Sequence, residues 1–282
     1  MTNAGHPSEE ESWLTVPDGL GLAWGCWPVE RPAAWIAIIH GYAEHAGRYG
    51  LTAADFNARG WGVAGLDLRG HGRSGGARGH VRRFEDYRSD LDAWLAALGP
   101  RIDSEPLFVL GHSFGGLVAA DYAWRRSPPW RGLILSSPFF GVARPVPPWK
   151  RALGRLASIV LPSLAFASGI RPEELSHDPE VGRAYAADPL VFRTATAGWF
   201  FETSRAIAAA FDAAAELRLP TLILSAAEDR VADPSRARDF FERLGSPDKE
   251  FISFPEMYHE ILNETGRRGV IERISRWIER RL

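Results

Sequence analysis

Ser113 stands where residue types and spacing can present a nucleophile. The segment Gly-His-Ser-Phe-Gly at 111–115 follows four apolar residues, 107–110, which predict a short buried strand. Residues 116–124 predict a helix with one apolar face. A strand, a sharp turn and a helix, with serine at the apex, form the context in which strain exposes the hydroxyl above a sheet. Glycines on both sides leave room for the turn, and the helix N-terminus favours developing negative charge.

The pattern Gly-x-Ser-x-Gly occurs a second time, at 72–76, so the pattern alone does not identify the nucleophile. Gly supplies 28 of 282 residues, which makes chance matches unsurprising. Ser74 lies among glycines and arginines, with no apolar run before it and no helical pattern after it. The context therefore favours Ser113 as the nucleophile and a loop position for Ser74.

A serine hydroxyl needs a base to take its proton, and the base needs an acid to orient it. In sites of this kind the chain order is serine, acid, histidine. Of the eight histidines, only His177 and His259 follow Ser113. His259 comes shortly after the last predicted strand, 250–254, at the strand edge where open α/β sheets build their sites, whereas His177 lies in a polar, turn-like stretch. We therefore expect His259 to be the base.

The acid is expected directly after the neighbouring predicted strand, 221–225. Asp233 is explained as the cap of a helix over 234–244, with Pro234 at its first position. Asp229 is the predicted acid, and spacing alone leaves Glu228 open as the alternative.

An acyl-transfer site also needs donors for an oxyanion. One candidate is the backbone N–H of Phe114, directly after the nucleophile. The second is the N–H of Tyr42, in the loop after the apolar run 34–39, where Gly41 allows a close approach. Both roles use backbone atoms only, so the two aromatic side chains carry no information about them.

The elements that must position these residues alternate between strand and helix, which predicts a mostly parallel sheet covered on both faces. We expect strands at 12–16, 20–27, 34–39, 63–68, 107–110, 133–136, 221–225 and 250–254, the first two antiparallel around Pro17-Asp18-Gly19. We expect helices at 48–59, 87–98, 116–124, 234–244 and 270–282. The alternation stops near residue 141. Residues 143–212 contain no clean strand and predict a helical insertion above the sheet, and residues 1–142 and 213–282 predict the α/β core.

Composition excludes several classes of protein. Hydrophobic residues make up 45% of the chain and charged residues 24%, with a net charge of -2, so no general affinity for nucleic acid or anionic membrane is expected. A single cysteine, Cys26, excludes an internal disulfide and a cysteine metal cluster. The first twelve residues are polar and acidic, unlike a signal peptide, so we expect a cytoplasmic protein. No apolar run reaches the length of a membrane span.

Six segments in this order resemble the serine hydrolases of the α/β-hydrolase superfamily that include monoacylglycerol lipases and bacterial lysophospholipases, a group similar to serine aminopeptidase S33. They are His40–Tyr49 (HGYAEHAGRY), Asp67–Ser74 (DLRGHGRS), Gly111–Gly116 (GHSFGG), Asp188–Leu190 (DPL), Ala227–Asp229 (AED) and Tyr258–Glu260 (YHE). The stretch HG-x-x-EH-x-x-RY is the most distinctive of them. The resemblance implies an α/β-hydrolase fold, with a mostly parallel eight-stranded sheet and a helical lid.

The resemblance implies the same triad of Ser113, Asp229 and His259, with Tyr42 and Phe114 as the oxyanion hole. It also assigns Glu44 and Arg48 to the glycerol end of a substrate. The alternative for these two is a solvated ion pair at a helix start, since they lie four residues apart. The acid loop reads Ser-Ala-Ala-Glu-Asp, without the glycine common in the family, and the insertion is the least family-like part.

The expected function is hydrolysis of a small lipid ester of the monoacylglycerol type through an acyl-enzyme, with no metal or cofactor. A lysophospholipase or a general short-chain esterase remains an alternative. A peptidase cutting near proline would need a site for a free amino terminus, and Glu173-Glu174 is the one acidic cluster of the insertion. A non-catalytic binding protein on the same fold is the last alternative.

The insertion is rich in large apolar residues, including Leu153, Leu156, Ile159, Val160, Leu161, Leu164 and Phe166. One interpretation is a lid for lipid entry whose basic start, Lys150, Arg151 and Arg155, makes peripheral contact with an anionic membrane. The other, equally supported, is a helix packed on the core or on a second subunit. The oligomeric state stays open at this stage.

Overall fold

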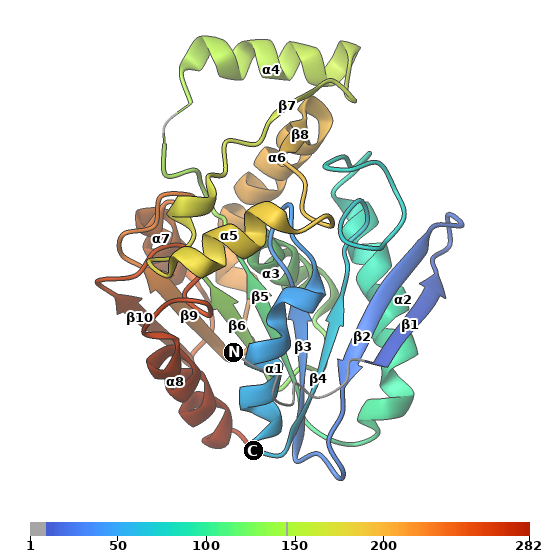
Figure 1. Cartoon of the computed structure of the whole chain (residues 1–282), viewed down its shortest axis with the longest axis vertical. Coiled ribbons are helices and arrows are strands. Elements are labelled where there is room, and N and C mark those ends of the chain that lie inside the picture. Colours follow the sequence, from blue (N-terminus) through green and yellow to red (C-terminus); the bar gives the residue numbers. More distant parts are fainter. Residues whose placement is uncertain (1–9, 145) are drawn as a thin grey trace.

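A mostly parallel sheet forms the centre of the protein (Figure 1). The structure, a computed structural model, describes residues 10–144 and 146–282, without the side chains at 148, 150 and 151. Within these residues one sheet has eight strands. Their order across the sheet is β1 (Glu10–Thr15), β2 (Gly21–Trp27), β4 (Trp61–Leu66), β3 (Ala34–Ile39), β5 (Leu107–His112), β6 (Gly132–Ser136), β9 (Thr221–Ala226) and β10 (Lys249–Phe254). The pairs β1–β2 and β2–β4 are antiparallel, and the other neighbours are parallel.

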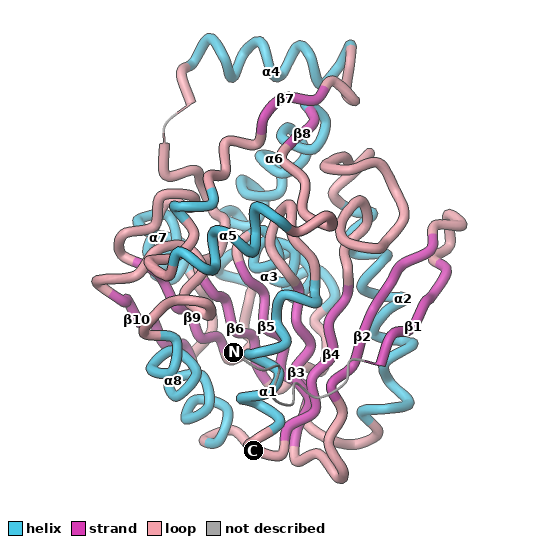
Figure 2. The backbone as a smooth tube through the Cα atoms, in the orientation of Figure 1, coloured by secondary structure: helices cyan, strands magenta, loops and turns pink. Residues whose placement is uncertain are grey.

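Helices cover both faces of this sheet (Figure 2). On one face α1 (Gly50–Asn57) and α8 (Arg267–Glu279) share a hydrophobic cluster with the strands. On the other face a second cluster includes α2 (Glu85–Ile102), α3 (Phe114–Arg126) and α7 (Pro234–Arg243). All six residues of β3 are buried, because a strand between two helical layers has no solvent-facing side.

The parallel arrangement brings four loops to one edge of the sheet. Strands β3, β5, β9 and β10 run in the same direction, so their carboxyl ends lie side by side. The loops that follow them carry Gly41, Ser113, Asp229 and His259. Functional sites of open α/β sheets lie at this edge, where loops from distant parts of the sequence meet.

The segment between β6 and β9 lies above that edge (Figure 1). It contains α4 (Pro148–Val160), α5 (Pro179–Ala187) and α6 (Ala197–Ala213), with α6 packed on α3 and α4 packed on α6. We call residues 143–212 the cap. Its treatment as a separate unit, distinct from the core at 1–142 and 213–282, stays a prediction.

The expectation that the cap contains no strand is wrong. Two three-residue strands, β7 (Ala165–Ala167) and β8 (Thr194–Thr196), pair antiparallel within it. Each is shorter than the alternation needed to recognise a strand from sequence, and the two are far apart along the chain. In the described part of the chain, no helix combines the length and apolar character needed to cross a membrane.

Candidate active site

Ser113 occupies the sharp turn between β5 and α3. Its φ of 53° and ψ of -119° place it in a conformation that L-residues rarely adopt. A Cβ added to Gly115 would lie 2.1 Å from the carbonyl oxygen of Ile39, and one added to Gly111 would lie 2.5 Å from that of Gly115. Glycine at these two positions therefore lets the helix start press against β3 and hold the strained turn.

The structure brings Ser113, His259 and Asp229 into one hydrogen-bonded line. His259 Nε2 lies 2.8 Å from Ser113 Oγ, and His259 Nδ1 lies 2.7 Å from Asp229 Oδ2. All three residues are buried. The carboxylate next to Nδ1 sets the tautomer with the proton on Nδ1, which leaves Nε2 free to accept the serine proton.

The second oxygen of Asp229 is anchored by the backbone. Oδ1 accepts from the N–H groups of Val231 and Ala232, each at 2.8 Å. Glu228 is exposed and Asp233 accepts from Ser235 N–H as a helix cap. Asp229 is thus the carboxylate that reaches His259, and neither neighbouring acid does.

The other two candidates from the sequence have different surroundings. His177 Nδ1 lies 2.8 Å from Glu264 Oε1, away from Ser113, and its ring stacks on Tyr258. Ser74 is buried in a loop, where its hydroxyl accepts from Ala23 N–H at 2.9 Å and donates to a carbonyl oxygen at 2.5 Å. These contacts hold the His177 ring and the loop around Ser74 in place, and neither of the two side chains faces the Ser113 hydroxyl.

Electrostatics favour a proton on His259 more than on the neighbouring His112. Burial opposes the charged form of His259, but the carboxylate of Asp229 outweighs it, so the pKa of His259 is raised above its usual value. Burial, together with the charge of His259, lowers the pKa of His112 to about 4. His112 is therefore neutral near pH 7, although its ring centroid lies 5.0 Å from that of His259.

The loop after β3 passes close to the serine. A Cβ on Gly41 would lie 3.2 Å from Ser113 Cβ, so the glycine permits this approach. Within the described chain, neither Tyr42 N–H nor Phe114 N–H has a hydrogen-bond acceptor. The side chains serve other purposes: Tyr42 Oη donates to Thr194 O in the cap at 2.8 Å, and Phe114 is fully buried. Two unpaired backbone donors beside a nucleophile can stabilise an oxyanion.

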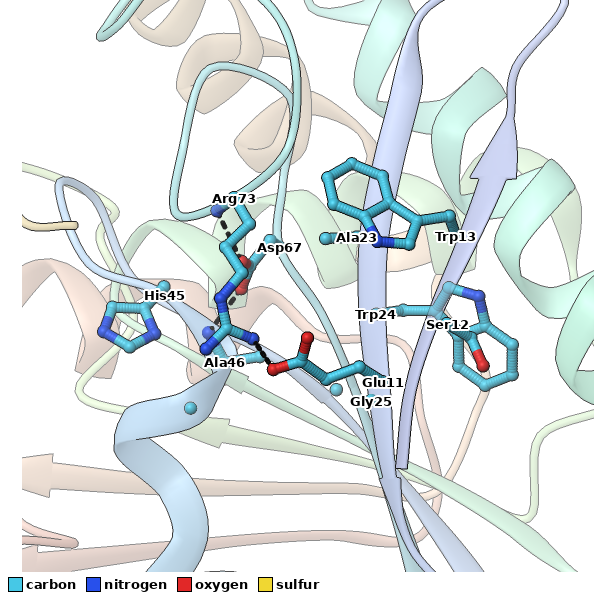
Figure 3. A pocket seen from close by; sticks show the side chains of 12 residues that line it. Glu11, Ser12, Trp13, Ala23, Trp24, Gly25, His45, Ala46, Asp67 and Arg73 are labelled. Carbon is cyan, nitrogen blue, oxygen red and sulfur yellow. Dashed lines mark hydrogen bonds and ion pairs between the residues drawn. The ribbon is translucent and has the colours of Figure 1, made fainter. Parts of the chain in front are cut away.

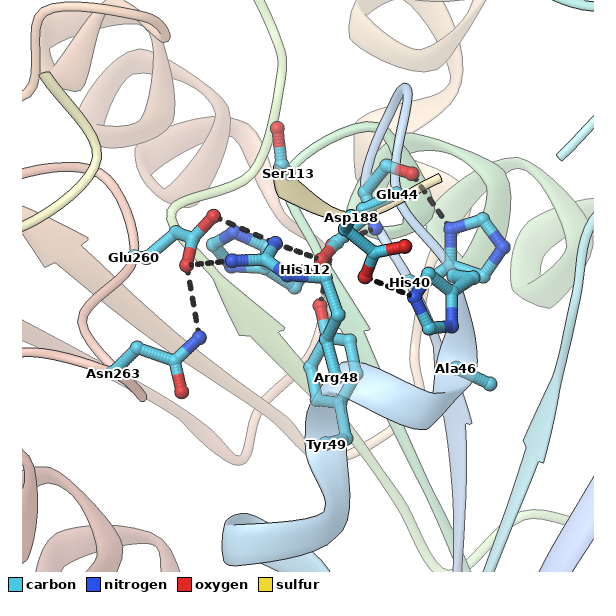
Figure 4. Close-up of polar contacts among 12 residues, drawn as sticks. His40, Glu44, Ala46, Arg48, Tyr49, His112, Ser113, Asp188, Glu260 and Asn263 are labelled. Carbon is cyan, nitrogen blue, oxygen red and sulfur yellow. Dashed lines mark hydrogen bonds and ion pairs between the residues drawn. The ribbon is translucent and has the colours of Figure 1, made fainter. Parts of the chain in front are cut away.

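Glu44 and Arg48 form an ion pair four residues apart, as the sequence allowed, but Glu44 is buried and the Arg48 side chain is only 10% exposed (Figure 4). Arg48 also donates from both Nη atoms to both carboxylate oxygens of Glu260, at 2.8 Å each. We call these three residues the Glu44–Arg48–Glu260 bridge. Sequence reasoning did not single out Glu260, although it directly follows His259 in the Tyr-His-Glu segment.

A small cavity reaches Ser113 between the core and the cap. Its volume is about 20 Å³, roughly room for one water molecule. The core side is polar and includes Glu44 and Arg48, and the cap side is formed by Ile170, Leu175 and Tyr185.

Another cavity, of about 10 Å³, lies at the edge of β1 and β2 and is bordered by the Arg73–Glu11 ion pair (Figure 3). None of the Ser113, His259 or Asp229 side chains lines it. Among the described residues, no group of three or more His, Cys, Asp or Glu side chains is arranged to hold a metal ion.

Comparisons with known proteins identify the family of this chain. The serine aminopeptidase S33 family matches residues 30–266. Phospholipase YtpA of Bacillus subtilis is 34% identical over 248 residues, which cover 87% of this chain and 95% of that protein. The monoacylglycerol lipase of Mycolicibacterium smegmatis is 31% identical over 262 residues, 92% and 93% of the two chains.

Solved structures show the same fold. The crystal structure of the Paleococcus ferrophilus monoacylglycerol lipase matches with a TM-score of 0.80 and 28% identity, over 96% of this chain and 99% of that chain. The predicted α/β-hydrolase fold is thereby confirmed.

Proposed function

The chain belongs to the serine aminopeptidase S33 family and is a serine hydrolase, and we propose that it releases fatty acid from monoacylglycerol-type lipid esters. The observation that carries the proposal is the hydrogen-bonded line from Ser113 through His259 to Asp229. The substrate class is supported by the names of the relatives, which include monoacylglycerol lipases of Mycolicibacterium smegmatis and Paleococcus ferrophilus.

In the proposed mechanism His259 Nε2 takes the proton of Ser113 Oγ as the oxygen attacks the ester carbonyl. The charge that develops on the carbonyl oxygen is received by the N–H groups of Tyr42 and Phe114. Asp229 keeps the imidazole in the required tautomer and stabilises the imidazolium. His259 then gives its proton to the leaving alcohol, and Ser113 is left as an acyl ester.

Hydrolysis of the acyl-enzyme repeats the sequence with water as the nucleophile. His259 takes a proton from the water, the same two N–H groups hold the oxyanion, and Ser113 leaves with the proton returned by His259. Every bond made and broken in this cycle is accounted for by the chain's own groups and water, so the proposed chemistry needs no metal or cofactor.

The alcohol of the substrate is proposed to leave on the side of Glu44 and Arg48, which border the cavity at Ser113. Direct contact of these two side chains with glycerol hydroxyls stays a prediction. The cap side of the cavity is formed by Ile170, Leu175 and Tyr185, so we propose that these three side chains select among alcohols.

A lysophospholipase is the second candidate, because Phospholipase YtpA is the relative with 34% identity. The test is acyl release from monoacylglycerol, lysophosphatidylcholine and p-nitrophenyl esters of one acyl chain, measured side by side. A proline-containing peptide amide in the same panel tests the peptidase alternative. We expect the highest kcat/KM on monoacylglycerol, and a preference for lysophosphatidylcholine would replace the proposed substrate.

The nucleophile assignment has a separate test. A fluorophosphonate probe is expected to label the wild-type protein and to leave Ser113→Ala unlabelled, while Ser74→Ala labels like the wild type. Unchanged labelling of Ser113→Ala would remove the proposed triad and, with it, the hydrolytic mechanism. Labelling of the wild type would also exclude the non-catalytic alternative.

We also propose that the cap makes peripheral contact with a lipid surface. Leu153, Leu156 and Ile159 on α4 are 58%, 59% and 71% exposed, so they are not packed on the protein's own core. The less exposed positions of this helix, Gly154, Ala157 and Ser158, are small, and the helix contacts α6. A helix with its large apolar side chains turned outward is typical of an interfacial helix. Of the predicted basic start, only the Arg155 side chain lies among the described residues, where it is exposed, while those of Lys150 and Arg151 lie outside them.

Vesicle co-sedimentation tests this contact. Ile159→Asp should bind phosphatidylglycerol vesicles more weakly than the wild type, whereas Leu51→Asp, on a leucine of α1 that is 48% exposed, should bind normally. Equal binding of all three proteins would contradict the membrane role. A dimer in solution that Ile159→Asp dissociates would assign the face to a second subunit instead. Cytoplasmic location stays a prediction.

A further inference from the structure

Three charged residues with little solvent exposure connect the two loops that the proposed chemistry uses (Figure 4). Arg48 Nη1 donates to Glu44 Oε2 at 2.6 Å, and its two Nη atoms donate to the two oxygens of Glu260 at 2.8 Å. The side chains of Arg48, Glu44 and Glu260 are 10%, 5% and 5% exposed. One guanidinium thus joins a residue beside the oxyanion loop to the residue next to the base.

At one end, Glu44 fixes the oxyanion loop. Its Oε1 accepts from Gly41 N–H at 2.6 Å and from Tyr49 Oη at 2.8 Å. On the far side of the same glycine, the carbonyl oxygen of Gly41 lies 2.7 Å from His40 Nδ1. His40 Nε2 accepts from Leu68 N–H, so the proton is on Nδ1 and is donated to that carbonyl. Both peptide groups flanking Gly41 are therefore held, which sets the direction of the next N–H, that of Tyr42.

At the other end, Glu260 fixes the base loop. It directly follows His259, and its own N–H donates to Leu175 O in the cap at 2.8 Å. Its Oε2 also accepts from Asn263 Nδ2 at 2.9 Å. The cap holds the backbone of Glu260 and Arg48 holds its carboxylate. The backbone of His259, the preceding residue, is therefore restrained as well.

The bridge is poorly suited to be the main binding group for a substrate alcohol. Glu44 already accepts three hydrogen bonds, and Arg48 gives both its Nη atoms to carboxylates. Burial opposes ionisation of Glu44, but the charge of Arg48 holds the pKa of this carboxyl at about 2. Buried charges of this kind contribute little net stability, and they are well suited to fix one geometry.

We propose that Arg48 is a positioning residue for acyl transfer, because through Glu44 it orients the Tyr42 N–H and through Glu260 it places His259. The inference rests on the proposed function, since it assumes that these two groups act at Ser113. It differs from the predicted contact with glycerol, because here the bridge orients groups that act in the transition state of any ester, whatever its alcohol.

The test uses two substrates that share an acyl group and differ in the alcohol, monobutyrylglycerol and p-nitrophenyl butyrate. Arg48→Lys keeps the charge but cannot reach both carboxylates with a planar fork. We expect kcat to fall about 10- to 100-fold for both esters, with KM within about twofold, because misplaced catalytic groups cost rate without weakening binding.

Deacylation gives the sharpest readout. Once the alcohol has left, both esters give the same butyryl-enzyme, so a slower deacylation step in a burst experiment cannot come from a lost alcohol contact. Arg59→Lys is the matched control, since Arg59 forms ion pairs with Glu272 and Glu279 on the surface. This control is expected to keep wild-type kcat and KM for both esters.

Glu260→Gln is the second variant, because it is isosteric and decides the matter if Arg48→Lys does not fold. It should lower kcat for both esters at least about threefold with KM unchanged. A loss confined to monobutyrylglycerol, or expressed in KM, would overturn the inference in favour of alcohol binding. So would kcat within threefold of wild type in the folded variants. If the proposed function itself were wrong, the wild-type protein would hydrolyse neither ester.

Discussion

The bonds around Asp229 predict what a change of one atom does to the site. In the wild type, Asp229 Oδ1 accepts hydrogen bonds from the N–H groups of Val231 and Ala232, at 2.8 Å each. In Asp229→Asn we expect the side-chain oxygen to keep these two hydrogen bonds. The new NH₂ group then faces His259 Nδ1, which Asp229 Oδ2 approaches at 2.7 Å. An NH₂ group can donate to Nδ1 but cannot accept a hydrogen bond from it, so it selects the tautomer that carries the proton on Nε2.

The wrong tautomer presents an N–H to Ser113 Oγ, where the mechanism needs a lone pair. The corresponding substitution in a serine protease costs about 10⁴-fold in kcat, which corresponds to about 5 kcal/mol of transition-state stabilisation. We expect a loss of that order in steady-state hydrolysis of p-nitrophenyl butyrate. The melting temperature should change little, because both hydrogen bonds from the backbone N–H groups survive and no buried charge loses its charged partner.

Glu228→Gln is the matched control, because Glu228 precedes Asp229 in the same loop and is exposed. It should retain wild-type kcat. An Asp229→Asn protein that keeps kcat within tenfold of wild type would refute the reasoning from tautomer and geometry. A large loss in Glu228→Gln with Asp229→Asn active would move the acid to Glu228, the alternative left open by spacing.

Three further predictions concern the same site. Ser113→Ala should lose about 10³-fold or more in kcat while folding normally, and undiminished ester hydrolysis would rule out the assigned nucleophile. Because the pKa of His259 is raised and its neutral form is the base, kcat/KM should fall as pH drops through that raised pKa, and a flat profile from pH 5 to 8 would contradict this. Gly41→Ala should lower kcat about 10²-fold, because its Cβ would lie 2.8 Å from Glu44 Oε1. In the matched variant Gly269→Ala the added Cβ would meet no atom within 4 Å, so the free energy of unfolding in a denaturant titration should rise by about 0.5–1 kcal/mol.

Predictions that rested on local chemistry match the described structure closely. The run 34–39 predicted a strand and forms β3 with the same ends. The region 87–98 lies inside the longer helix α2, Glu85–Ile102, because caps and end turns carry a weak apolar signal. The elbow at Ser113 was visible because its strand, turn and helix are contiguous, and the acid and the base each followed a recognisable strand.

Contacts between distant segments could not be predicted in the same way. Arg48 and Glu260 are 212 positions apart, and nothing in either local pattern indicates that they meet. The i, i+4 spacing of Glu44 and Arg48 favoured a surface ion pair equally well, and only the packing of the cap and the base loop buries it. The exposed apolar face of α4 is a further case, since periodicity detects the face but not what covers it.

The cap and the proposed catalytic loops depend on the same hydrogen bonds. Tyr42 Oη donates to Thr194 O, Glu260 N–H donates to Leu175 O, and His45 Nε2 lies 2.9 Å from Asp188 Oδ2. Each contact joins the cap to one of the two loops that flank Ser113. The cavity between them has a volume of about 20 Å³, roughly room for one water, so we expect cap side chains to move when an acyl chain reaches Ser113. Because the hydrogen bonds of Gly41 to His40 and Glu44 also fix the Tyr42 N–H from the core side, we expect such a movement to open the cavity without releasing the oxyanion loop.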